Sequence, residues 1–208
     1  MDNITLIATA SLLNLLAAIS PGPDFVMAVK NSLTYSRKTG IFTGIGIGLG
    51  ISIHIIYCAA GIGYIISKSI IVFNVIKYIG AAYLIYIGIK AILSKKTKIE
   101  INRNDIPDDI SWFQAIRIGF LTNVLNPKAT LFFLGLFTFV IKPQTPIYII
   151  FILSLIMVFT AISWFTLVAL FFSQQRIQVI FLKFEKAING FFGGLLIALG
   201  IKIALTSK

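Results

Sequence analysis

Two short proline motifs carry the residues of this chain that are best placed to do chemistry. The first is Ser20-Pro21-Gly22-Pro23-Asp24 and the second is Asn126-Pro127-Lys128, and each interrupts a long apolar stretch. Proline removes a backbone hydrogen-bond donor and clashes with the preceding turn, so a helix must stop and restart at each motif. A restarted helix N-terminus offers unpaired N–H groups that can bind an anion such as a carboxylate.

Each motif also has the residue types expected where a helix begins. Gly22 suits the N-cap, Pro23 suits the first helical position, and Asp24 falls in the first turn, where the helix dipole favours a negative charge. The second motif repeats this order with a positive charge, Lys128. A simple proline kink, satisfied by neighbouring helices, is the alternative. The pairing of the motifs favours two broken helices that face a shared polar site.

The composition indicates the elements that position these motifs. The chain has 208 residues, of which 58% are hydrophobic and only 12% are charged, against about 25% charged in soluble proteins. Apolar stretches of about 20 residues, the length that spans a bilayer, recur along the chain. We therefore expect an all-α membrane protein with six transmembrane helices, at roughly 4–29, 40–66, 70–93, 113–141, 146–172 and 188–206.

Within such spans, Asp24 and Lys128 are the most informative residues. A charge inside a membrane helix costs at least about 2.5 to 3.5 kcal/mol, so it usually has a partner or a function. We expect the two residues to lie near each other, with Asp24 contacting an ammonium group or a coupling proton and Lys128 contacting a carboxylate. The alternative is that Asp24 only caps a helix near the interface while Lys128 snorkels to it.

Other polar residues in the spans are weaker candidates for the same site. Asn123 lies one helical turn before Asn126, and an amide in lipid needs a partner. His54 is the only histidine; it either shuttles protons or contacts substrate, or it packs in the core with its ring nitrogens satisfied. Tyrosines in membrane spans either line a polar cavity or anchor a helix at the interface. The remaining candidates are Asn31, Tyr83 and Tyr86.

The chain divides into two similar halves. We expect a first three-helix repeat at 1–93, a hydrophilic connector at 94–112 and a second repeat at 113–208. The pattern Leu84-Ile85-x-x-Gly88-Ile89-Lys90-x-x-Leu93 recurs at 196–205. Three helices is an odd number, so the second copy must be inverted, and each copy begins with a proline-broken helix. Twelve of the 18 Lys and Arg residues fall on the side of the connector, which predicts that both termini lie outside.

The same counts exclude several classes of function. The net charge of +11 comes from cations at the ends of spans, so positive-inside loops explain it better than nucleic-acid binding. Cys58 is the only cysteine, which excludes an intrachain disulfide. The spans hold no cluster of nucleophile and base, carboxylates or metal ligands, so we expect neither an enzyme nor a cofactor. Glycine-rich helix faces permit close packing and a homodimer.

Taken together, these motifs resemble the lysine exporter and homoserine/threonine efflux family of bacterial amino-acid exporters. The resemblance rests on the motif at 20–24, Gly40-x3-Gly44, Gly80-x2-Tyr83-Leu84-x-Tyr86-x-Gly88, and Asn123-x2-Asn126-Pro127-Lys128-Ala129 followed by Phe132-Phe133. It implies six helices, the bacterial inner membrane, and proton-driven efflux of amino acids or related metabolites. The alternative is a channel or accessory membrane protein without carrier activity.

Overall fold

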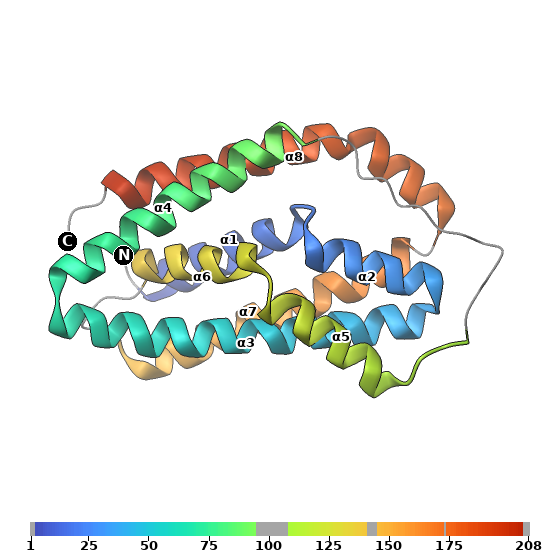
Figure 1. Cartoon of the computed structure of the whole chain (residues 1–208), viewed down its shortest axis with the longest axis horizontal. Coiled ribbons are helices and arrows are strands. Elements are labelled where there is room, and N and C mark those ends of the chain that lie inside the picture. Colours follow the sequence, from blue (N-terminus) through green and yellow to red (C-terminus); the bar gives the residue numbers. More distant parts are fainter. Residues whose placement is uncertain (1–2, 95–107, 141–144, 173, 206–208) are drawn as a thin grey trace.

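A computed structural model describes residues 3–94, 108–140, 145–172 and 174–205, which form helices joined by short turns, with no strand among them. Figure 1 shows the arrangement of the helices. Their bounds are α1 Asn3–Ile19, α2 Pro23–Thr34, α3 Arg37–Lys68, α4 Ile70–Ile92, α5 Trp112–Val124, α6 Pro127–Val140, α7 Ile147–Phe172 and α8 Gln175–Leu205.

Four of these helices are each long and apolar enough to cross a membrane. They are α3, α4, α7 and α8. The pairs α1–α2 and α5–α6 pass the same test only when each pair is taken together, with bends of 56° and 58° at the breaks. The apolar stretches predicted six spans, and the described residues contain four clear spans, or up to six if each bent pair is one span.

Both breaks fall at the proline motifs. Gly22 is the N-cap of α2 in an extended conformation, and Pro23 follows it at the start of the helix. At the second break, the backbone N–H of Lys128 donates to the side-chain oxygen of Asn126 at 3.0 Å. This bond satisfies one of the amides exposed where α6 begins. The predicted restart of a helix at each motif is confirmed.

The last helix is longer than the sequence suggested. It begins at Gln175, whereas the apolar pattern placed its start near 188. The extra turns mix apolar residues with Gln, Arg, Lys and Glu, which favour helix, so the helix continues beyond its most apolar part. The expected connector at 94–112 falls largely on residues 95–107, which lie outside the described residues.

The two bent pairs run in opposite directions through the centre of the molecule. In Figure 1 the chain passes from left to right through α1 and α2, and from right to left through α5 and α6. Helix α3 packs closely against α5 and α7, and α4 pairs with α8 along one side. Both termini are marked at the same end of the molecule. The two breaks therefore meet near the middle of the long axis.

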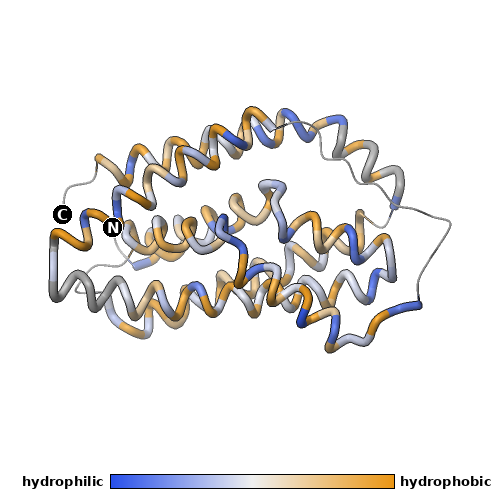
Figure 2. Tube along the Cα trace, viewed as in Figure 1, coloured by the Kyte–Doolittle hydropathy of each residue, from blue (hydrophilic) through white to orange (hydrophobic). Residues whose placement is uncertain are grey.

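Apolar side chains cover much of the outside as well as the core. Figure 2 shows hydrophobic residues along all helices, with hydrophilic residues gathered at helix ends and at the central breaks. On α7, Phe151 is 64% exposed and Phe159 is 73% exposed. Large apolar side chains exposed on this scale fit a surface that contacts lipid.

Candidate functional site

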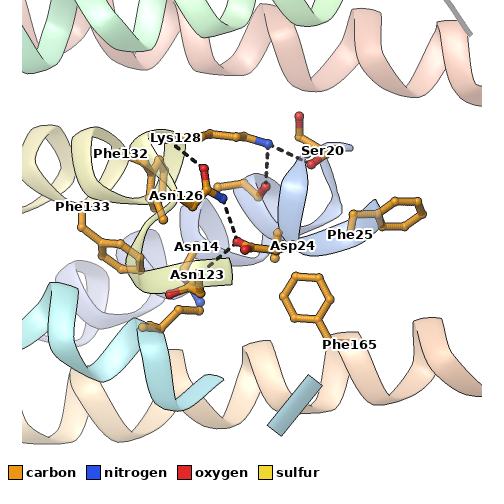
Figure 3. A pocket seen from close by; sticks show the side chains of 15 residues that line it. Asn14, Ser20, Asp24, Phe25, Asn123, Asn126, Lys128, Phe132, Phe133 and Phe165 are labelled. Atoms are coloured by element: carbon orange, nitrogen blue, oxygen red, sulfur yellow. Dashed lines mark hydrogen bonds between the residues drawn. The ribbon is translucent and has the colours of Figure 1, made fainter. Parts of the chain in front are cut away.

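The residues of the two breaks line one small pocket, called here the break pocket. Its polar lining comes from α1, the first break and the second break, and Figure 3 shows these side chains pointing toward one another. Its apolar wall includes Phe25, Phe132, Phe133 and Phe165. Its volume is about 40 Å³, room for about three water molecules. Its polar lining residues are Asn14, Ser20, Asp24, Asn123, Asn126 and Lys128.

Asp24 is held by two side-chain amides from the other half of the chain. Its Oδ2 accepts hydrogen bonds from the Nδ2 of Asn123 at 2.9 Å and of Asn126 at 3.1 Å. The Oδ1 atoms of Asp24 and Asn123 are buried and have no hydrogen-bond partner among the described residues. Two unsatisfied buried acceptors are costly, and they suit a ligand that brings N–H donors.

Lys128 reaches across to the end of α1. Its Nζ donates to the backbone carbonyl of Ser20 at 2.8 Å and lies 3.5 Å from that of Ala17. The break frees these carbonyls, because no amide one turn later completes the helix. A Cβ on Gly22 would lie 3.2 Å from the Lys128 Nζ, so glycine leaves room for the lysine. An ammonium has three N–H donors, which leaves one for an anion.

Asp24 and Lys128 thus line the same pocket, as expected, but they bind different partners. The carboxylate is bound by amides and the ammonium by carbonyls. Each charge is stabilised by the protein and still has bonding capacity toward the pocket. The arrangement can bind a small molecule that carries both an ammonium and a carboxylate.

His54 supports this site from behind. Its Nε2 lies 3.0 Å from the backbone carbonyl of Asn123 and its Nδ1 lies 2.6 Å from the Tyr57 hydroxyl. A carbonyl only accepts, so Nε2 donates to it and Nδ1 accepts from the tyrosine. The ring also stacks on Phe133, with 5.6 Å between the ring centroids. His54 does not line the break pocket, so it positions Asn123 from outside it.

A second, larger cavity lies beside the break pocket, between the breaks and the helices α4 and α8. It is called here the side cavity, and its volume is about 330 Å³. Tyr83 and Tyr86 line it, together with the prolines Pro21, Pro23 and Pro127. The two expected roles of the tyrosines were to line a polar cavity or to anchor a helix at the interface. Both tyrosines line this cavity, and the Tyr86 side chain is also 56% exposed, so both roles stay open.

Asn31 lies elsewhere. Its side-chain amide donates to the Thr43 hydroxyl at 2.9 Å, linking α2 to α3. It lines neither the break pocket nor the side cavity. Of the predicted candidates, the structure therefore brings together the two motifs, Asn123 and the tyrosines, while His54 lies behind the site and Asn31 apart from it.

Several lining residues have no motif to mark them. Asn14 lines the break pocket and donates to the carbonyl of Met157 at 3.0 Å, which links α1 to α7. In the sequence, Asn14 is marked only by being a single amide residue within an apolar stretch. Phe25 and Phe165 could not be identified from the sequence, because the chain is so rich in apolar residues that nothing distinguishes these two from the other phenylalanines. Among the described residues, no group of three or more His, Cys, Asp and Glu could hold a metal ion.

Comparison with known proteins finds a matching family model and several relatives. A family model described as LysE type translocator matches residues 15–207. The chain is 30% identical over 195 residues to the uncharacterized membrane protein YrhP of Bacillus subtilis (strain 168), covering 90% of this chain and 93% of that protein. It is 25% identical over 205 residues to the threonine efflux protein of Escherichia coli (strain K12), covering 98% and 99%.

A third relative aligns over a shorter stretch. The homoserine/homoserine lactone efflux protein of Salmonella typhimurium (strain LT2) is 28% identical over 131 residues, covering 63% of this chain and 62% of that protein. No solved structure matches this chain.

Proposed function

The chain belongs to the LysE-type translocator family, and from this premise we propose that it exports amino acids or related small zwitterionic metabolites. It is a multi-pass protein of the bacterial inner membrane and a transporter by family. In the proposal it is a secondary carrier that works by alternating access and is driven by the proton gradient. Relatives named as threonine and homoserine efflux proteins support the substrate class.

The observation that carries the proposal is that the break pocket is lined by two opposite charges, Asp24 and Lys128. Within the described part of the chain, one carboxylate oxygen of Asp24 has no hydrogen-bond partner, and Lys128 keeps one N–H beyond its carbonyl contacts. In the proposal, Asp24 takes the substrate α-ammonium or the exchanged proton, and Lys128 takes the α-carboxylate. The opened N-termini of α2 and α6 add backbone amides beside the carboxylate.

The packing of α4 against α8 supports an inverted repeat. A Cβ on Gly88 would meet the Ile197 side chain at 2.7 Å, and a Cβ on Gly200 would meet the Ile85 side chain at 2.8 Å. These four residues are equivalent in the repeated sequence, Gly88 with Gly200 and Ile85 with Ile197. The same contact is therefore made twice with the halves exchanged, as a two-fold axis requires. Two such halves can expose one site alternately to each side.

Charge supports the orientation of the transporter. In Figure 1, α2 ends and α3, α5 and α8 begin at the right end of the molecule. Lys30, Arg37, Lys38 and Arg117 belong to these helix ends. By the positive-inside rule this end faces the cytoplasm, and both termini face outward. The side cavity would then receive substrate from the cytoplasm, as an exporter requires.

Transport in everted membrane vesicles tests the proposal. Vesicles from an exporter-deficient bacterium that produces this chain expose its cytoplasmic face to the medium. We expect them to accumulate labelled threonine when the interior is acidic, and to lose this accumulation when a protonophore collapses the gradient. Vesicles that contain Asp24→Asn at the same protein level are the matched control. An equal uptake in empty vesicles would favour the alternative of a channel or accessory protein without carrier activity.

A further inference from the structure

The side cavity is large enough for an amino-acid side chain and joins the proposed site. Ser20, Gly22, Asn126 and Lys128 line both the break pocket and the side cavity. The break pocket, at about 40 Å³, cannot enclose a whole amino acid, whereas the side cavity measures about 330 Å³. A substrate whose α-carbon groups bind Asp24 and Lys128 has its side chain directed into the side cavity.

The end of the side cavity away from the breaks is formed by α4 and α8. Ser94 lies just beyond α4, and the Nδ2 of Asn189 on α8 donates to its hydroxyl at 2.7 Å. Lys90 lies one turn earlier on α4, with its Nζ 5.9 Å from the centre of the Tyr86 ring. All four side chains line the cavity. A substrate side chain that extends from the breaks therefore meets polar groups and a cation.

The charges in this lining have one sign. Lys90 and Lys128 both line the side cavity, and among the described residues that line it there is no Asp or Glu. The carboxylate nearest in sequence to this wall is Glu185 on α8, which is buried one turn before Asn189 and is not part of the lining. A second positive charge on the substrate would be repelled by both lysines, and because Lys90 is exposed, solvent and salt moderate this repulsion.

We infer that the side cavity binds the substrate side chain and that Lys90 makes it selective, accepting neutral and acidic side chains and excluding cationic ones. This inference rests on the proposed function. In the proposed function, Lys128 is occupied by backbone carbonyls and by the substrate carboxylate. Lys90 is then the cation of the cavity lining that faces the end of the substrate side chain. Specificity of this kind comes from a repulsive element rather than from an added attraction.

Arginine and citrulline test the inference, because their side chains have nearly the same shape and differ in charge. In everted vesicles, each is added as a competitor of labelled threonine uptake, and the ratio of their half-inhibitory concentrations is measured. For the wild type we expect arginine to compete about tenfold more weakly than citrulline. Lys90→Glu should reduce or invert this ratio, and Lys90→Met should bring it near one.

Lys30→Glu is the matched control. Lys30 is an exposed lysine near the cytoplasmic end of α2 that does not line the cavity, so this change alters the surface charge equally and should leave the ratio unchanged. If Lys90→Glu does not fold, as judged by gel filtration in detergent, Lys90→Met decides the matter. Equal competition by arginine and citrulline in the wild type, or an unchanged ratio in the Lys90 variants, would overturn the inference alone. Absence of uptake of every labelled amino acid tested, threonine included, would refute the proposed function itself.

Discussion

The side chain of Asn126 uses both ends of its amide to join the two broken helices. Its Nδ2 donates to the Asp24 carboxylate at 3.1 Å, and its Oδ1 accepts the backbone N–H of Lys128 at 3.0 Å. Asp24 belongs to the first turn of α2, and Lys128 belongs to the first turn of α6. One residue thus caps a helix in its own half while it orients the acidic group of the other half.

Replacing Asn126 with alanine should therefore damage both stability and transport. Loss of the N-cap costs about 1 kcal/mol, and loss of a hydrogen bond to a charged group costs about 1.5 to 3 kcal/mol. We expect threonine uptake in everted vesicles to fall about tenfold or more. Ser69→Ala is the control, because Ser69 caps α4 through Val72 and lines neither cavity. A similar loss of uptake in both variants would show that capping alone explains the effect.

Asp24→Asn and Lys128→Met should each weaken threonine binding about tenfold or more, since each removes one of the two charges proposed to hold the zwitterion. Binding is measured by calorimetry on the purified chain in lipid nanodiscs. Because both charges act on one ligand, the double variant should lose less than the product of the single losses. Strictly additive losses would contradict the joint role, and wild-type export by Asp24→Asn would remove the role of Asp24.

The breaks could be predicted from the sequence because their causes are local. Pro23 and Pro127 fix where a helix restarts whatever surrounds them, and the charge after each proline marks it as more than a kink. The meeting of Asp24 and Lys128 followed from the repeat, which requires the two breaks to lie at similar depth. The role of Asn126 as an N-cap could also be predicted, since it precedes a proline at the start of a helix, but its hydrogen bond to Asp24 could not.

The side cavity could not be predicted in the same way. Asn189 and Lys90 have no local signature, because an amide in a long helix and a lysine near the end of a span are common in membrane proteins. Their meeting depends on how far α4 extends along α8, which is a property of tertiary packing. The start of α8 at Gln175 was also hidden, since polar residues that form helix well resemble a loop when only hydropathy is considered.

Gly50 shows how closely α3 must approach the site. A Cβ at this position would lie 2.7 Å from the Oδ1 and 2.8 Å from the Cβ of Asn123. Gly50→Ala should therefore displace Asn123 from Asp24, at a cost of about 1 to 3 kcal/mol for overpacking, and should reduce threonine uptake several-fold. Gly61→Ala on the same helix is the control, because a Cβ there meets nothing within 4 Å. Uptake equal to that of the wild type in Gly50→Ala would show that the position of Asn123 tolerates change.

Asp109 provides a prediction that concerns a residue outside the candidate membrane spans. Its carboxylate accepts hydrogen bonds from the Ser36 hydroxyl at 2.6 Å and from the Thr39 hydroxyl, at the start of α3. These bonds hold the pKa of Asp109 below its usual value. A lowered pKa in the folded state means that the contact stabilises the fold fully above the unfolded-state pKa, about 3.9, and that this stabilisation is lost as the pH falls through the lower folded-state value.

Asp109→Ala should accordingly lower the thermal unfolding midpoint at pH 7 and have a shrinking effect below about pH 4. The midpoints of the wild type and the variant are measured in detergent across this range. Asp108→Ala is the control, since it removes the same charge one residue away and should change the midpoint less at pH 7. A difference between Asp109→Ala and the wild type that stays constant from pH 7 to pH 3 would show that the carboxylate charge does not hold the start of α3.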